Sequence, residues 1–191
     1  MAEQTSLPGT VSEAGPEART IQWGFVVVWI AVLGLLGLVA FKLLQVQQGP
    51  VGIGTQAPEF TLTTFNGEQI DLGDLQGKVV VLNFWASWCK PCEQEARELE
   101  QAYQRYTDEG VAFLGVDYVD TEKEALAYLD RFGITYPNGP DLGTRISQAY
   151  RIRGVPETYI IGPEGEIAVV KIGPYASLEE IVDDVEFVIG K

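Results

Sequence analysis

The stretch VVVLNFWASWCKPC, residues 79–92, contains both cysteines of the 191-residue chain. Its first half is an unbroken apolar and β-branched run, which predicts a strand buried on both faces of a sheet. The residues that follow space their apolar groups as one face of a helix, namely Cys92, Ala96, Leu99, Tyr103 and Tyr106. Cys89 therefore falls near a helix N-terminus, where unpaired N–H groups and the helix dipole lower a thiol pKa. The pattern predicts a dithiol–disulfide redox centre formed by Cys89 and Cys92.

The composition excludes several other kinds of site. The chain has no histidine, which rules out Ser–His and Cys–His catalysis and any histidine-ligated metal, and two cysteines cannot close a four-ligand zinc site. Haem attachment needs a histidine directly after the second cysteine, where this chain has Glu93. The net charge of −14 disfavours nucleic acid as a partner. We therefore expect no metal and no cofactor beyond the Cys89–Cys92 disulfide itself.

The N-terminal quarter of the chain predicts a membrane anchor. Residues 1–22 are polar and aperiodic, and we expect a disordered tail there. Residues 23–41 carry no charge, and as a helix they would span roughly 28 Å, close to the thickness of a bilayer core. We predict a single-pass anchor over residues 23–44 and a Gly/Pro-containing linker over residues 45–56, with a cleaved signal peptide and a buried core helix as the alternatives. One basic residue on each side, Arg19 and Lys42, leaves the orientation undetermined.

Residues 57–191 predict one α/β domain. Two short runs around Asn66-Gly67 indicate a β-hairpin, and residues 111–116 predict a second buried strand. Residues 158–161 and 167–172 predict an antiparallel pair joined by a tight turn. Residues 136–143 are turn-rich.

Three helices complete the predicted domain. Thr121 and Glu124 form a capping-box pattern for a helix that ends at Gly133, with inward apolar residues expected at Leu126, Leu129 and Phe132. A short helix follows around Ile146, Ala149 and Tyr150, and Ser177 with Glu180 begins the last one. Strands alternating with helices and then a hairpin and a helix indicate an α/β sandwich.

These elements resemble the thioredoxin superfamily in their order: a strand, WCKPC at residues 88–92 on a helix, then GVPET at residues 154–158 entering a hairpin. Further segments are similar to its membrane-anchored TlpA/ResA/CcmG-like branch: APEF (57–60), LQGK (75–78) and LNFWASW (82–88). The resemblance implies a thioredoxin-like sandwich, a central mixed sheet flanked by helices, with an N-terminal β-hairpin extension and one preceding transmembrane helix. It also implies a thiol-disulfide oxidoreductase that reduces substrate disulfides through Cys89 and Cys92 on the extracytoplasmic side of the cytoplasmic membrane, notably in cytochrome c maturation.

The resemblance also implies roles for individual residues. It implies a cis peptide bond at Val155–Pro156 beside the cysteines, where Val155 and Pro156 would hold backbone open for an extended substrate segment. Glu95, three residues after Cys92, matches a glutamate near the site in ResA-type relatives, and is a candidate proton acceptor for Cys92, with a solvated surface glutamate as the alternative. Asn83 stands where cytosolic thioredoxins commonly have a buried aspartate.

The expected mechanism is thiol–disulfide exchange. An exposed Cys89 acts as the nucleophile, Cys92 resolves the mixed disulfide, and Trp88 forms an apolar lip beside Cys89. Lys90 adds a favourable field or is simply solvated, and Glu93 is expected to pair with Arg97 on the helix surface. The implied partners are a disulfide-bearing protein such as apocytochrome c and a membrane dithiol electron donor.

Three other functions use the same residues. A disulfide-forming oxidant would share the motif and differ in its reduction potential. A Cu(I)-binding assembly chaperone would use the two thiolates, although the chain lacks histidine and has methionine only at Met1. A purely structural disulfide is disfavoured, because closing a loop with two residues between the cysteines stabilises little.

Overall fold

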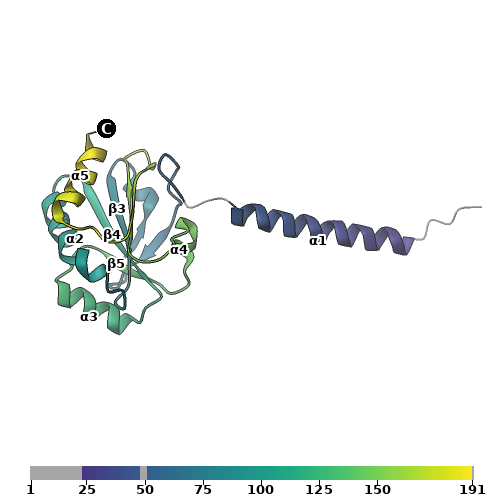
Figure 1. Ribbon diagram of the computed structural model, residues 1–191, viewed down its shortest axis with the longest axis horizontal. Helices are drawn as coiled ribbons and strands as arrows, with labels where there is room; N and C mark the ends of the chain where they lie inside the picture. Colours follow the sequence, from purple (N-terminus) through teal and green to yellow (C-terminus); the bar gives the residue numbers. More distant parts are fainter. Residues whose placement is uncertain (1–22, 48–50, 191) are drawn as a thin grey trace, which may run out of the picture. The chain divides into compact units, whose positions relative to one another are not determined.

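A computed structural model describes residues 23–47 and 51–190 of the chain, so the predicted tail, residues 1–22, lies outside the described residues. The chain divides into two compact units, Met1–Gln48 and Gly49–Lys191. In the first, a single helix, α1, runs from Trp23 to Gln47, three residues past the end expected for the anchor. By length and composition, its segment Trp23–Phe41 is long and apolar enough to cross a membrane, and the side chains there are exposed. Figure 1 draws α1 as one continuous helix.

The second unit is built on a five-stranded mixed sheet in the order β5-β4-β3-β6-β7. Strands β3 (Val79–Trp85), β4 (Val111–Tyr118) and β5 (Asn138–Asp141) are parallel. Strand β6 (Glu157–Ile161) pairs antiparallel with β3, and β7 (Ile167–Ile172) pairs antiparallel with β6. The order and directions confirm the predicted thioredoxin-like α/β sandwich.

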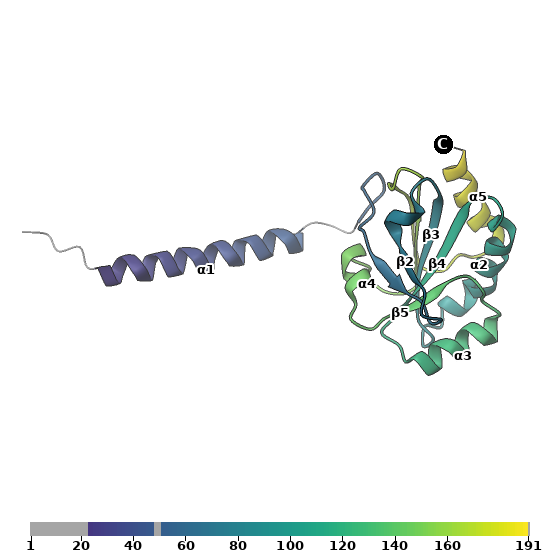
Figure 2. The same ribbon diagram turned by 180° about the vertical axis from the view of Figure 1, so that it is seen from behind.

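Helices cover both faces of this sheet, as Figures 1 and 2 show from opposite sides. One face carries α2 (Cys92–Tyr106), α3 (Glu122–Phe132) and α5 (Leu178–Ile189). The other carries the short helix α4 (Arg145–Tyr150) and a two-stranded hairpin of β1 (Thr61–Thr63) and β2 (Gln69–Asp71), which is followed by a 3-10 turn, η1 (Leu72–Leu75). Ser177 and Thr121 each accept a backbone N–H from the residue three positions on, and thereby cap α5 and α3 as predicted.

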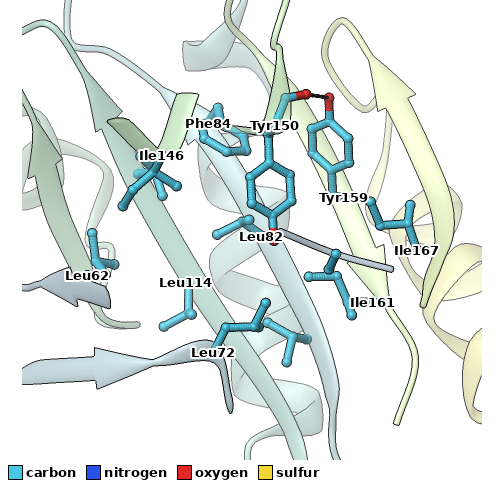
Figure 3. Close-up of a cluster of buried hydrophobic side chains, with 13 residues drawn as sticks. Leu62, Leu72, Leu82, Phe84, Leu114, Ile146, Tyr150, Tyr159, Ile161 and Ile167 are labelled. Atoms are coloured by element: carbon cyan, nitrogen blue, oxygen red, sulfur yellow. Dashed lines mark hydrogen bonds between the residues drawn. The ribbon is translucent and has the colours of Figure 1, made fainter. Parts of the chain in front are cut away.

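Strand β3 lies at the centre and is buried along its whole length, as its composition predicts. Its alternate residues face two different cores. Val80, Leu82 and Phe84 enter the hairpin-side cluster, which Figure 3 shows, and Val79 and Val81 face α2 and α5. The full hairpin-side cluster comprises Ala57, Leu62, Leu72, Val80, Leu82, Phe84, Leu114, Val116, Ile146, Tyr150, Tyr159, Ile161 and Ile167.

Strand β5 was not predicted, because its sequence NGPD combines residues that disfavour strands. It lies at the sheet edge, where Pro140 is tolerated, since an edge strand needs fewer ladder donors. Gly139 is required by packing: a Cβ atom there would come within 2.3 Å of the Thr63 carbonyl oxygen. The close approach of the hairpin therefore explains a glycine that local rules assign to a turn.

Two other expectations differ from the structure. On α3 the buried residues are Ala125 and Tyr128, and the predicted inward residues Leu129 and Phe132 are partly buried against the same cluster, whereas Leu126 is exposed. The C-terminal end of the predicted linker also belongs to the folded domain. Gly54 donates its N–H to the Ile167 carbonyl, and the Thr55 carbonyl accepts from the Ile167 N–H, so this segment is hydrogen-bonded to the start of β7.

Candidate active site

The two cysteines lie in the turn between β3 and α2, and they form a disulfide. Cys89 donates its N–H to the Ala86 carbonyl at 3.1 Å, which closes the turn after the strand. Cys92 is the first residue of α2 and donates its own N–H to the Cys89 sulfur at 3.1 Å. An N–H donor at a helix N-terminus stabilises negative charge on sulfur, so this geometry favours a Cys89 thiolate once the disulfide is reduced.

The cysteines belong to a small buried group that we call the cysteine cluster: Trp85, Ala86, Cys89, Cys92, Ala96, Ala125 and Tyr128. Cys89 is only 3% exposed in this disulfide form, which corrects the expectation of an exposed sulfur. The sulfur is covered because it is bonded to Cys92 and packed in the cluster. Trp85 stacks on Tyr128 with ring centroids 4.5 Å apart, and this pair joins the redox turn to α3.

Trp88 directly precedes Cys89 in the sequence, whereas Val155 comes from the distant segment before β6. The structure places both residues near the redox turn. The Trp88 side chain is 57% exposed and donates its indole N–H to the Val119 carbonyl at 3.2 Å. Val155 packs against the cysteine cluster, and its peptide bond to the buried Pro156 is cis. An exposed aromatic ring and a cis-proline peptide bond therefore accompany the disulfide.

Glu95 is buried within α2, one turn beyond Cys92, and is only 1% exposed. Its carboxylate accepts the Asn83 side-chain N–H at 2.9 Å and the Tyr175 backbone N–H at 2.8 Å. Burial raises the pKa of Glu95 to about 7, and these two hydrogen bonds oppose the shift. The surface alternative for Glu95 is thus wrong, and the group can gain or lose a proton near neutral pH.

Asn83 connects this carboxyl group to the sheet. Its side-chain amide also donates to the Thr158 hydroxyl at 3.0 Å, and Thr158 is its register partner on β6. Polar groups buried in this way need their hydrogen bonds satisfied. The network therefore fixes the position of Glu95 from two strands and from the segment before α5.

The charged residues at the start of α2 pair differently from our expectation. Glu93 accepts from Lys90 at 2.9 Å and from Arg131 of α3 at 3.3 Å, whereas we predicted Arg97 as its partner. The hydrogen bond from Lys90, followed by Arg131, lowers the pKa of Glu93. Lys90 therefore pairs with Glu93 at the exposed start of α2.

Sequence reasoning missed two carboxyl groups beside the turn, Asp117 and Asp120. Both are buried, Asp117 completely, and Asp120 accepts the Ser87 N–H at 2.7 Å. Their one available signal is two aspartates in the otherwise apolar run VAFLGVDYVD, residues 111–120. Among the residues that the structure describes, no group of three or more His, Cys, Asp or Glu side chains is arranged to hold a metal ion.

Comparisons with known proteins agree with this geometry. The sequence matches the AhpC/TSA family over residues 53–170. It is 35% identical over 147 residues to the thiol-disulfide oxidoreductase ResA of Bacillus cereus (strain ZK / E33L), with 75% of this chain and 85% of that protein aligned. The chain belongs to the ResA-like thiol-disulfide oxidoreductases.

Other relatives and solved structures give the same result. The ResA protein of Halalkalibacterium halodurans is 37% identical over 131 residues, which cover 69% of this chain and 73% of that protein. The thioredoxin-family thiol:disulfide interchange protein of Chlorobium tepidum TLS superposes with a TM-score of 0.66 at 26% identity, covering 75% of this chain and 99% of that one. StoA from Bacillus subtilis gives a TM-score of 0.59 at 25% identity, covering 67% and 96%. The Cys89–Cys92 pair of this ResA-like chain is thus a redox-active disulfide.

Proposed function

We propose that this ResA-like protein is anchored in the cytoplasmic membrane by α1 and reduces protein disulfides outside the cytoplasm, as in cytochrome c maturation. The observation that carries the proposal is the Cys89–Cys92 disulfide at the N-terminus of α2, with the buried Glu95 one turn further on. The apolar stretch Trp23–Phe41 supports the anchor. A membrane tether suits delivery of electrons from a membrane dithiol donor, and disulfide substrates accumulate outside the cytoplasm.

In the proposed reaction the Cys89 thiolate attacks one sulfur of a substrate disulfide. A Cys89–substrate disulfide forms, the substrate disulfide breaks, and the first substrate sulfur leaves as a thiolate that takes a proton. Glu95 accepts the proton of the Cys92 thiol, and the Cys92 thiolate attacks the Cys89 sulfur. The Cys89–Cys92 disulfide forms and the second substrate thiolate leaves, so the substrate gains two electrons and two protons, and a membrane dithiol donor later restores the dithiol.

Two surfaces would hold the substrate next to the sulfur. Trp88 offers an exposed ring, and the backbone at Val155–Pro156 offers pairing to an extended segment. In this arrangement the substrate is recognised largely through its main chain. The same site can therefore accept a protein chain such as apocytochrome c without a deep pocket.

The direction of electron flow is tested by the reduction potential of the full chain in detergent, equilibrated with thiol–disulfide buffers. We expect a value of about −270 mV or lower, as in reducing thioredoxins. A value near about −120 mV would overturn the reductase assignment in favour of a disulfide-forming oxidant. Cys92→Ser is the matched control, because it cannot form the internal disulfide and should show no two-electron couple.

The location is tested by labelling with a membrane-impermeant maleimide in a Cys89→Ser, Cys92→Ser background, which has no other cysteine. Lys123→Cys places a single thiol on exposed α3, and Ala2→Cys places one before α1. We expect label on Lys123→Cys in intact cells and on Ala2→Cys only after lysis. The reverse pattern would contradict the proposed orientation, and recovery of both variants in the soluble fraction would contradict the anchor.

A further inference from the structure

The connecting segment between β7 and α5, residues 173–176, contacts two parts of the candidate active site. Gly173 donates its N–H to the Pro156 carbonyl at 3.0 Å, beside the cis peptide bond. Two residues further on, Tyr175 donates its N–H to the Glu95 carboxylate at 2.8 Å. The same short segment therefore holds the backbone expected to pair with substrate and the carboxyl group expected to accept a proton.

The connecting segment belongs to neither β7 nor α5, so side chains fix its position. The Tyr175 side chain is buried, and its hydroxyl donates to the Asp184 carboxylate of α5 at 2.9 Å. Ala176 donates its N–H to the Glu180 carboxylate, also on α5, at 2.8 Å. The direction of the Tyr175 N–H toward Glu95 therefore depends on these contacts.

Lys171 on β7 interacts with both of the groups that fix the connecting segment. Its ammonium group forms an ion pair with Glu180, the residue that binds the Ala176 N–H. The same ammonium group lies 5.2 Å from the centre of the Tyr175 ring, within the range of a cation–π interaction. One cation therefore stabilises the Tyr175 ring and the carboxylate that holds Ala176.

Glu95 is surrounded by polar and charged groups from several elements. Those that interact with it electrostatically are Asn83 of β3, Glu98 of α2, Tyr128 of α3, Tyr136, Lys171 of β7 and Tyr175 of the connecting segment. Burial raises the pKa of Glu95, whereas the Tyr175 N–H, the Asn83 amide and the Lys171 charge lower it, in that order of size. Lys171 is the one cation in this group, and it also fixes the residue that supplies the first of these donors.

We propose that Lys171 is a positioning residue for the exchange reaction, because it fixes the connecting segment whose N–H groups hold Glu95 and Pro156. Without this cation the segment loses a stabilising contact, and the hydrogen bond from Tyr175 to Glu95 opens more often. A carboxylate that loses a donor binds its proton more tightly, so Glu95 accepts a proton from Cys92 less readily at neutral pH. This role for Lys171 rests on the proposed function of Glu95 as the proton acceptor.

The position of the connecting segment is tested by NMR on the full chain in detergent, in its disulfide form. In the native chain the ¹³C signal of the Glu95 carboxyl group, assigned with Glu95→Gln, should titrate near pH 7. The Tyr175 N–H resonance should shift with the same midpoint, because this N–H donates to the titrating group. A Tyr175 resonance that does not follow the Glu95 titration would overturn the proposal without any Lys171 variant.

Lys171→Met keeps the aliphatic stem of the side chain and removes its charge. We expect the Glu95 midpoint to rise to about pH 8 and the Tyr175 N–H to exchange with deuterium about 10-fold faster than in the native chain. Lys171→Arg keeps a cation and should match the native chain in both measurements. An unchanged exchange rate in Lys171→Met would overturn the proposal even if the midpoint rose, since the lost charge alone would then explain the rise.

Activity separates the role of Lys171 from that of Glu95. The single-turnover rate of the reduced chain with a synthetic disulfide peptide is measured from pH 5 to pH 9. At pH 7 we expect Lys171→Met to react about 5-fold more slowly than the native chain, because the deprotonated fraction of Glu95 falls from about one half to about one tenth. Lys123→Met, an exposed lysine on α3, is the matched control and should keep the native profile.

The Glu95→Gln chain completes the comparison, since its profile should lack the midpoint near pH 7. If Glu95→Gln loses this midpoint and Lys171→Met keeps the native profile, the role of Lys171 is overturned and that of Glu95 stands. If the profile is unchanged in both variants, the proposed function of Glu95 is contradicted, and the role of Lys171 in exchange fails with it.

Discussion

Both faces of the central sheet carry an apolar core to which strand β3 contributes, but they differ in the polar groups buried near the cysteines. On the hairpin side, Leu82 and Phe84 lie in a cluster of apolar and aromatic side chains, in which the one hydrogen bond drawn in Figure 3 joins the Tyr159 hydroxyl to the Tyr150 carbonyl. On the other side, next to the cysteines, Asn83 binds the buried Glu95, and Asp117 lies on neighbouring β4.

The two kinds of buried group affect the stability of the fold differently. Burial of apolar area stabilises the fold at any pH, whereas a buried carboxyl group destabilises it whenever that group must be ionised. Glu95 and Asp117 both have raised pKa values, so each makes folding depend on pH. Such groups are kept where protons must be held near a reaction.

The largest effect on stability is expected on the hairpin side. Phe84→Ala should lower the free energy of unfolding by about 3–5 kcal/mol, because it leaves a cavity between rings that lie 5.5 and 5.8 Å from Phe84, those of Tyr150 and Tyr159. Urea unfolding of the full chain in detergent measures this loss, which should be the same at pH 5 and pH 8. A loss of unfolding free energy that changes with pH would contradict the claim that this apolar cluster stabilises the fold independently of pH. Phe84→Leu is the milder control.

A smaller, pH-dependent effect is expected from Glu95→Gln. The pKa of Glu95 is raised from 4.5 to about 7, so between these values the folded chain binds more protons than the unfolded chain and its stability falls as pH rises. The variant lacks this pH-dependent loss of stability, because glutamine does not titrate. Relative to the native chain it should therefore gain about 3 kcal/mol in unfolding free energy between pH 4 and pH 8.

Glutamine can occupy the position because the network around it can rearrange. If the Asn83 amide turns over, its oxygen accepts from the new glutamine and from the Thr158 hydroxyl, and the glutamine oxygen still accepts from Tyr175. Parallel urea titrations at several pH values measure the difference. A constant difference between the two chains would show that Glu95 does not titrate as its burial requires.

The smallest effect is expected at the surface of the same helix. Glu93→Gln removes the pairs with Lys90 and Arg131, and exposed ion pairs contribute little to stability. The unfolding midpoint should stay within error of the native value, and its small salt dependence should disappear. A loss of stability as large as that from Phe84→Ala would contradict this, because it would mean that the ion pairs of Glu93 contribute strongly to the stability of the fold.

The sequence predicts those parts of the molecule that depend on local patterns. The buried strand β3, the capped helices and the β6–β7 pair follow from hydrophobic period, capping residues and turn signals. Strand β5 does not, because only the packing of the hairpin against Gly139 explains its residues. Local sequence patterns therefore predict most helices and strands, whereas β5 depends on a tertiary contact.

The site is divided in the same way. The cysteines and Trp88 can be predicted from a motif of five consecutive residues. The burial of Glu95 depends on Tyr175, which is 80 residues away, and the environment of Asp117 depends on a loop that holds Ser87. Long-range contacts of this kind set the pKa values, and no pattern in a single sequence encodes them.

The central claim is that the Cys89–Cys92 pair performs exchange, with Cys89 attacking and Cys92 resolving. The most direct test adds a disulfide-bearing peptide to Cys92→Ser and to Cys89→Ser and follows each by mass spectrometry. We predict that Cys92→Ser holds the peptide in a mixed disulfide that dithiothreitol releases, whereas Cys89→Ser holds almost none. Capture by Cys89→Ser alone, or by neither variant, would contradict the account.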